Sequence, residues 1–157
     1  MAAYMGGMVG WLHNANTSLD KVSNGGAVTN NGAVTNTKTS GATTYIRLGG
    51  IVGYAQGGTG HAITNATNTV TIKNTKGGNS ADIGNSIADL GGIIGKIDQS
   101  DLTIGNDVAE GVKNSGAILN EGQNTDNGLG GIVGSITAAA NANTIQNCAS
   151  SGKIYRN

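Results

Sequence analysis

The sequence predicts an all-β fold, a short parallel β-helix (β-solenoid) of about four irregular repeats of ~42 residues each. Three observations predict it: a glycine block that recurs at even spacing, short β-branched segments between Gly and Asn, and no convincing helical periodicity. Only 11% of the 157 residues are charged. That composition fits a disordered polar tract or a repeat protein, and the even period favours the repeat protein.

The recurring block consists of Gly-Gly, two apolar residues and a further Gly. It begins at Gly6, Gly49, Gly91 and Gly130, and its second glycines are 43, 42 and 39 residues apart. This spacing predicts one domain over residues 1–157, with repeats at approximately 4–46, 47–88, 89–127 and 128–157. Because equivalent positions stack in a β-helix, Ile51, Ile93 and Ile132 are expected to form an interior ladder.

Each block is followed by a second element, an apolar β-branched residue, any residue and then Asn. The asparagines of this element are Asn24, Asn74, Asn114 and Asn147, and they are expected to form one amide ladder at a corner of the fold. Cys148 directly follows the last of them and is expected to fill a small interior position. The Gly-Gly pairs are expected at bends or where backbones pack closely.

Charge, cysteine content and hydropathy exclude several classes of protein. Nine basic residues balance nine acidic ones, which argues against nucleic-acid binding. A single cysteine excludes a disulfide scaffold, and no apolar segment is long enough to span a membrane. The N-terminus lacks a signal-peptide pattern, so we expect a cytosolic protein, a mature form or a fragment. The low charge argues against an ordinary cytosolic enzyme.

The sequence predicts no catalytic residue, no cofactor and no metal site. The acidic segment from Asp98 to Glu110 offers oxygen ligands to Ca²⁺, but its spacing is irregular, so a solvated loop is the favoured interpretation. A polysaccharide lyase would need a cluster of carboxylates and basic residues that is absent from the pattern. His13 and His61 are isolated and are expected in exposed loops.

Two aromatic residues occupy equivalent places in the first two repeats. Trp11 and Tyr54 follow the block at the same distance, and Lys96 and Ser135 hold that place later. An aromatic pair of this kind either stacks on sugar rings or packs locally, and local packing is favoured.

The repeats resemble a known family of bacterial surface proteins. The Gly-Gly-Ile-Val-Gly blocks, with Ile145-Gln146-Asn147-Cys148 and Gly152-Lys153-Ile154, are similar to GLUG-type repeats of cell-surface proteins. The resemblance extends over all four repeats and is clearest from Gly130 to Ile154. It implies a β-helical stalk or adhesive repeat at the surface of a bacterium, with no catalytic residue.

Uncapped ends of a β-helix template further strand pairing, so we expect the protein to be its own partner. The predicted function is a non-catalytic extracellular structural subunit that stacks head to tail into a filament or sheath. The alternative is a repeat segment of an adhesin that binds glycans or host surfaces. The residues predicted to form the assembly contact are Tyr4, Met5, Met8 and Val9 at one end and Ile145, Ile154 and Tyr155 at the other.

Overall fold

The computed structural model describes residues 2–13, 17–20, 22–25, 28–30, 44–75, 86–98, 100–106, 111–121, 126–137 and 142–156. Within these residues the protein is all-β, with parallel strands and no helix. The predicted all-β class is therefore confirmed. A search of the same residues for a helix long and apolar enough to cross a membrane found none.

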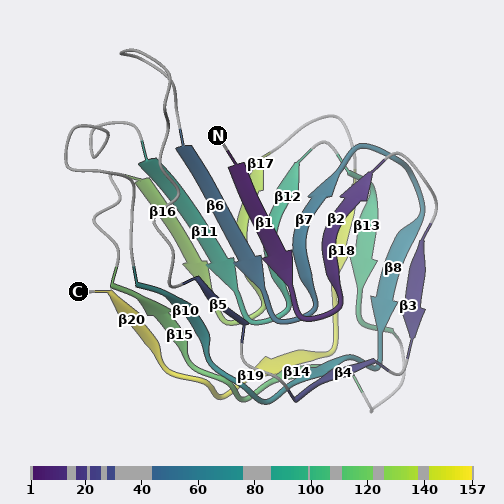
Figure 1. Cartoon of the computed structure of the whole chain (residues 1–157). Coiled ribbons are helices and arrows are strands. Elements are labelled where there is room, and N and C mark those ends of the chain that lie inside the picture. The colour runs from purple at the N-terminus through teal and green to yellow at the C-terminus, as the bar shows by residue number, and fades with distance from the viewer. Residues whose placement is uncertain are drawn as a thin grey trace.

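The strands form five parallel sheets, and each sheet takes one strand from each quarter of the chain (Figure 1). Sheet 1 consists of β1 (Ala2–Gly6), β6 (Thr44–Gly49), β11 (Ser86–Gly91) and β16 (Asp126–Gly130). Sheet 2 consists of β2 (Val9–His13), β7 (Val52–Gln56), β12 (Ile94–Asp98) and β17 (Val133–Thr137).

The three remaining sheets have shorter strands, of two to four residues. Sheet 3 consists of β3 (Ser18–Asp20), β8 (His61–Thr64), β13 (Leu102–Ile104) and β18 (Asn143–Ile145). Sheet 4 consists of β4 (Ser23–Asn24), β9 (Thr67–Asn68), β14 (Val112–Asn114) and β19 (Cys148–Ser150). Sheet 5 consists of β5 (Val28–Asn30), β10 (Ile72–Asn74), β15 (Ile118–Asn120) and β20 (Ile154–Arg156).

The chain passes through sheets 1 to 5 in the same order four times, and we call each passage a circuit. Successive circuits lie side by side in register, which places equivalent residues in columns across the sheets. In sheet 1, for example, Met5 pairs with Leu48, Leu48 with Leu90, and Leu90 with Leu129. Neighbouring strands of a sheet lie about 4.8 Å apart, so members of a column are in direct contact.

The observed circuits start earlier than the predicted repeats. The boundaries predicted after residues 46, 88 and 127 fall inside β6, β11 and β16. The Gly-Gly pair occupies the bend between the first and second strands of a circuit, as Gly49-Gly50 does between β6 and β7. The glycine block therefore marks a bend within each circuit and not the start of one.

Apolar side chains from all five sheets form two buried clusters. The larger cluster includes Ile51, Ile63, Ile93, Ile97 and Ile104, and the smaller one joins sheets 1 and 5 through residues such as Leu48 and Ile118. The residues of the expected isoleucine ladder lie in successive circuits. The amide of Ile51 donates to the carbonyl of Ile93 at 3.0 Å, and that of Ile93 to Ile132 at 2.9 Å.

The second glycine of each pair allows two circuits to approach closely. A Cβ added at Gly50 would collide with the carbonyl oxygen of Gly92 and would lie 2.5 Å from Cγ of Asn68. The corresponding Cβ at Gly92 would collide with the carbonyl of Gly131 and with the side chain of Asn114. Sheet 4 therefore packs its asparagines directly onto bare glycine backbone, which explains why the motif needs glycine there.

Candidate functional site

Exposed apolar side chains mark the two outermost circuits. In the part of the chain that the structure describes, the exposed large apolar residues are Met8 (52%), Trp11 (47%), Ile136 (45%), Ile145 (45%), Ile154 (47%) and Tyr155 (46%). The first two belong to the first circuit and the other four to the fourth. No such residue is exposed on the described parts of the second and third circuits.

The exposure at these ends comes from a missing neighbour and not from an unusual residue. Ile145 pairs with Ile104, which in turn pairs with Ile63, and both partners are fully buried. Ile154 pairs in the same way with the fully buried Ile118. The same side chain is thus buried in the middle of a column and exposed at its end, because no described strand pairs with it on its far side.

Within the described residues, the outermost strand of each sheet pairs with a strand on one side only. β1 to β5 are the terminal strands on one side of their sheets, and β16 to β20 are terminal on the other side. Each end therefore presents backbone N–H and C=O groups from five edge strands. Such groups are a template for pairing with another chain. Figure 1 shows the N-terminal and C-terminal strands at opposite edges of the stack.

The structure places the predicted assembly residues in these two outermost circuits. Met5 and Val9 are partly buried against the core clusters, and Tyr4 is also partly buried. Met8, Ile145, Ile154 and Tyr155 are exposed. Trp11 and Ile136 were not among the residues predicted for the ends. An alignment of the repeats would have identified Ile136 as an end residue, because Ile136 is the equivalent of Ile97 in the third repeat and the two residues pair.

The predicted amide ladder does not match the register. The observed ladder in sheet 4 runs from Asn24 to Asn68, then to Asn114 and finally to Ser150. The Nδ2 of each asparagine donates to the next circuit, at 3.3, 2.7 and 3.3 Å respectively. The ladder therefore has a direction, and it ends on a serine hydroxyl in the fourth circuit.

The other two predicted members belong to different corners of the fold. Asn74 ends β10 in sheet 5 and donates to Asn120 at 2.8 Å. Asn147 lies in the turn before β19 with a φ of 48°, and donates to the carbonyl of Asn106. The motif selected asparagines from three corners because most strands of sheets 4 and 5 end in Asn, and Asn147 lies in the turn that precedes a strand of sheet 4.

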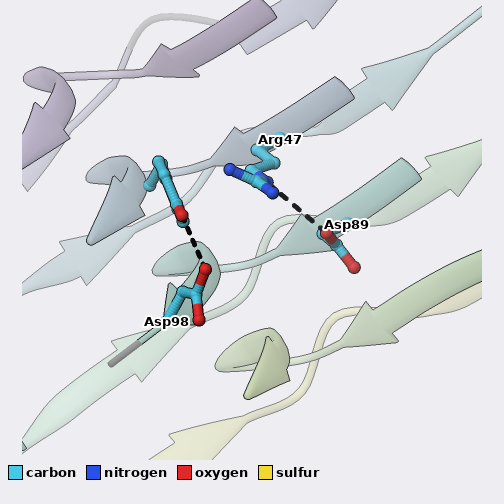
Figure 2. A network of polar contacts seen from close by, with 4 residues as sticks. Arg47, Asp89 and Asp98 are labelled. Carbon is cyan, nitrogen blue, oxygen red and sulfur yellow. Dashed lines mark hydrogen bonds and ion pairs between the residues drawn. The ribbon is translucent and has the colours of Figure 1, made fainter. Parts of the chain in front are cut away.

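A polar and aromatic network fills the space between sheets 1 and 2 (Figure 2). Nε of Arg47 lies 3.8 Å from a carboxylate oxygen of Asp89, and both side chains are buried. The guanidinium carbon of Arg47 lies 3.8 Å from the ring centre of Tyr54 and 5.1 Å from that of Tyr4. The hydroxyl of Tyr54 donates to Asp98 at 2.8 Å. These contacts join the first three circuits.

Burial raises the pKa values of two side chains in this network, Tyr54 and Asp89. Desolvation and the hydrogen bond to Asp98 raise the pKa of Tyr54 to about 12. Desolvation also raises the pKa of Asp89, although Lys96 and Arg47 oppose the shift. Both side chains are enclosed by neighbours of the same chain, so the network is suited to holding circuits together and not to meeting a substrate.

The two aromatic residues singled out in the sequence do lie in one column. Trp11 pairs with Tyr54, which pairs with Lys96, and Lys96 pairs with Ser135. The rings of Trp11 and Tyr54 are nearly parallel, with centres 6.3 Å apart. Tyr54 is buried, which supports local packing for this residue, whereas Trp11 keeps an exposed face.

The two histidines lie in different surroundings. His13 is exposed at the end of β2, and its ring lies beside Trp11. The expectation of an exposed loop is wrong for His61, which begins β8 and is 1% exposed. Its Nε2 lies 3.2 Å from the carbonyl oxygen of Gly57, because the glycine-rich turn before β8 folds over the ring.

Cys148 is partly buried against the larger core cluster, and its thiol donates to the carbonyl of Gln146 at 3.2 Å. Burial raises the pKa of the thiol, which disfavours the reactive thiolate. Of the acidic segment, Asp98 and Asp101 are described, whereas Asp107 and Glu110 lie outside the described residues. The described residues contain no group of three or more His, Cys, Asp or Glu side chains placed to hold a metal.

Comparisons of this chain with protein-family models, curated proteins and solved structures found no match. The GLUG resemblance therefore stays a prediction.

Proposed function

We propose that this protein is a non-catalytic extracellular structural subunit, a short parallel β-solenoid that stacks end to end into a surface filament or sheath. One observation carries the proposal. The exposed large apolar side chains of the described residues lie in the two outermost circuits, beside five edge strands at each end. Burying those side chains against another circuit would stabilise the contact by roughly 25 cal/mol per Å² of apolar surface.

The solenoid interpretation rests on the topology of the sheets. The order in which the chain visits the five sheets repeats four times, and each circuit pairs in parallel with the next. Stability in such an architecture comes from contacts between neighbouring circuits, so an outermost circuit has only half of its contacts. A further circuit from another copy would supply the other half.

A structural role also agrees with where the charged side chains lie. Arg47 and Asp89 are buried against each other between two sheets, and Lys73 pairs with Glu121 at 3.1 Å. The thiol of Cys148 faces the core cluster, and its raised pKa disfavours nucleophilic attack. These groups are engaged in holding neighbouring circuits together.

The alternative function is a repeat segment of a cell-surface adhesin. In a longer protein, flanking repeats would cover the same end surfaces. In the 157-residue chain alone, the exposed ring of Trp11 would offer a stacking face to a sugar. This alternative predicts a monomeric 157-residue chain that binds glycans. Self-assembly of the chain alone separates the two proposals.

The test is electron microscopy of the purified protein over a range of concentrations, with a charge placed in one end surface. The wild-type protein should form unbranched filaments. Ile154→Lys should abolish them, because a buried lysine would face the apolar column that continues from Ile118. Ser115→Asp is the matched control, since Ser115 is an exposed residue of the third circuit outside the end surfaces.

Filaments of normal length from the Ile154→Lys protein would show that Ile154 is not part of the contact between copies. Discrete wild-type monomers at every concentration would contradict the filament proposal and favour the adhesin segment. Circular dichroism of both variants would establish that the subunit itself remains folded.

A further inference from the structure

Resting on the proposed stacking, we infer that copies join head to tail, with each strand of one end circuit paired to the equivalent strand of the next copy. The fourth circuit of one copy pairs with the first circuit of the next, and each sheet continues into the same sheet of its neighbour. In this register Cys148 of one copy lies directly beside Val22 of the next copy. The partner is thus a second copy of this chain, held by an extension of its own columns.

The column that contains Cys148 supports this register. The amide of Thr67 donates to the carbonyl of Val22 at 2.9 Å, which places Val22 beside Ala66. The amide of Lys113 donates to the carbonyl of Ala66 at 2.8 Å, and Val112 pairs with Cys148.

The four residues of this column therefore follow one another through the four circuits. Ala66 and Val112, the inner two, are fully buried. Val22 and Cys148, the outer two, are only partly buried, although both pack against the same core cluster. A fifth small apolar residue at either end would complete their burial.

A second column, in sheet 3, independently supports the same register between copies. Leu19 pairs with Ile63, Ile63 with Ile104, and Ile104 with Ile145. Ile145 is 45% exposed, and Leu19 is partly buried at the opposite end. Placing Leu19 of the next copy beside Ile145 would cover both with side chains of the kind that each already contacts on its inner side.

The shape of a circuit favours a translation between copies over a two-fold contact. The chain passes through the five sheets in one direction, and neighbouring circuits pair in parallel. A translation along the stack superimposes all five sheets on themselves at once. A two-fold axis across the stack reverses the direction of the circuit, so the edge strands that meet would run antiparallel, whereas the described strand pairs are parallel. A translational contact is heterologous and generates an open filament.

The amide ladder of sheet 4 is compatible with the same direction. Each described amide group donates toward the later circuit, and the ladder reaches the hydroxyl of Ser150. This hydroxyl accepts from Asn114 and keeps its own O–H donor. In the translated stack sheet 4 continues beyond Ser150 with Asn24 of the next copy, so the ladder continues into the first circuit of that copy.

The test is a thiol cross-link between Val22→Cys and the native Cys148. Within one copy these positions are three strand spacings apart, about 14 Å, which exceeds the reach of a disulfide. Between stacked copies they are one spacing apart, about 4.8 Å, within the range of Cα separations of disulfides. Mild oxidation of Val22→Cys filaments should therefore give a ladder of covalent dimers, trimers and longer chains on a non-reducing gel.

Two controls isolate the register. Val22→Cys combined with Cys148→Ser should give no ladder, because only one thiol of the pair remains. Leu19→Cys with the native Cys148 should also give none, because these residues belong to sheets 3 and 4. If Val22→Cys fails to fold, Leu19→Cys with Ile145→Cys in the Cys148→Ser background tests the second column in the same way.

The outcomes separate this inference from the proposed function. A ladder whose cross-linked peptide joins residues 22 and 148 supports the register. Filaments that give no ladder, or that give only 22–22 and 148–148 links, overturn the register and leave the stacking proposal standing. Absence of both filaments and cross-links overturns the two proposals together.

Discussion

At the scale of single residues, the fold depends on side chains that are small or form amide bridges. Asn68 is fully buried, accepts from Asn24 and donates to Asn114, so one side chain connects three circuits. Gly50 provides the bare backbone on which this asparagine lies. A glycine and an asparagine that are distant in the sequence thus form one structural unit, which recurs as Gly7 with Asn24 and as Gly92 with Asn114.

Substituting Gly50 by Ala should destabilise the protein strongly. The added Cβ has no room between the carbonyl of Gly92 and the side chain of Asn68, so strands must separate. Overpacking of this kind costs about 1–3 kcal/mol, and more where backbone must move. Urea unfolding measures the loss. Gly25→Ala is the matched control, because a Cβ at Gly25 would meet nothing within 4 Å. Equal stability of the two variants would contradict this account of the motif.

Tyr54 should make the protein sensitive to alkaline pH. Its pKa is raised from 10.0 to about 12 in the folded state, so between these values the unfolded chain has released a proton that the folded chain keeps. Stability is therefore fully present below pH 10 and is lost as the pH rises through about 12. Tyr54→Phe should flatten this decline of the unfolding free energy. An unchanged slope in Tyr54→Phe would assign the alkaline sensitivity to other groups.

At the scale of strands, the same sequence pattern has different consequences in the middle and at the end of a sheet. β12 and β17 both place an isoleucine in one column, as Ile97 and Ile136. Ile97 is fully buried because circuits lie on both sides of it, whereas Ile136 has a neighbour on one side only. The contribution of a residue to the stability of the subunit thus depends on its circuit as well as on its type.

Truncating these two isoleucines should therefore separate folding from assembly. Ile97→Ala should cost about 2–5 kcal/mol of unfolding free energy, because it leaves a cavity in the core. Ile136→Ala should change the unfolding of the isolated subunit much less, but it should raise the concentration needed for filaments. Urea unfolding and sedimentation measure the two effects. A large loss of subunit stability in Ile136→Ala would show that this side chain supports the circuit itself.

At the scale of the whole molecule, the end surfaces and the sides differ in character. The described exposed side chains of the two inner circuits, such as Thr69, Lys113 and Ser115, are polar. The ends carry the exposed apolar residues and the open strand edges. Association through the ends is therefore favoured over association through the sides. A formal net charge of zero also keeps repulsion between stacked copies low.

Much of the fold and part of the candidate site could be predicted. The all-β class followed from Val, Ile and Thr segments between Gly and Asn. The column of Ile51, Ile93 and Ile132 followed from the recurring glycine block, because the strands before and after it have five or six residues in these circuits. The asparagine ladder could not be predicted correctly, because Asn68 and Asn74 end successive strands and only Asn74 follows a β-branched apolar residue, whereas Ala66 holds that place before Asn68. The hydrogen bonds of Asn68 to Asn24 and Asn114 show that Asn68 is the ladder member.

The sequence by itself determined the all-β class, the period and the need for glycine at the bends. These properties depend on local conformation and on spacing along the chain, and both can be read from residue order. Tertiary structure alone decided which asparagines share a ladder, that Arg47 and Asp89 lie buried together, and which apolar residues remain uncovered. Those properties depend on which strands become neighbours, and on whether a neighbour exists at all.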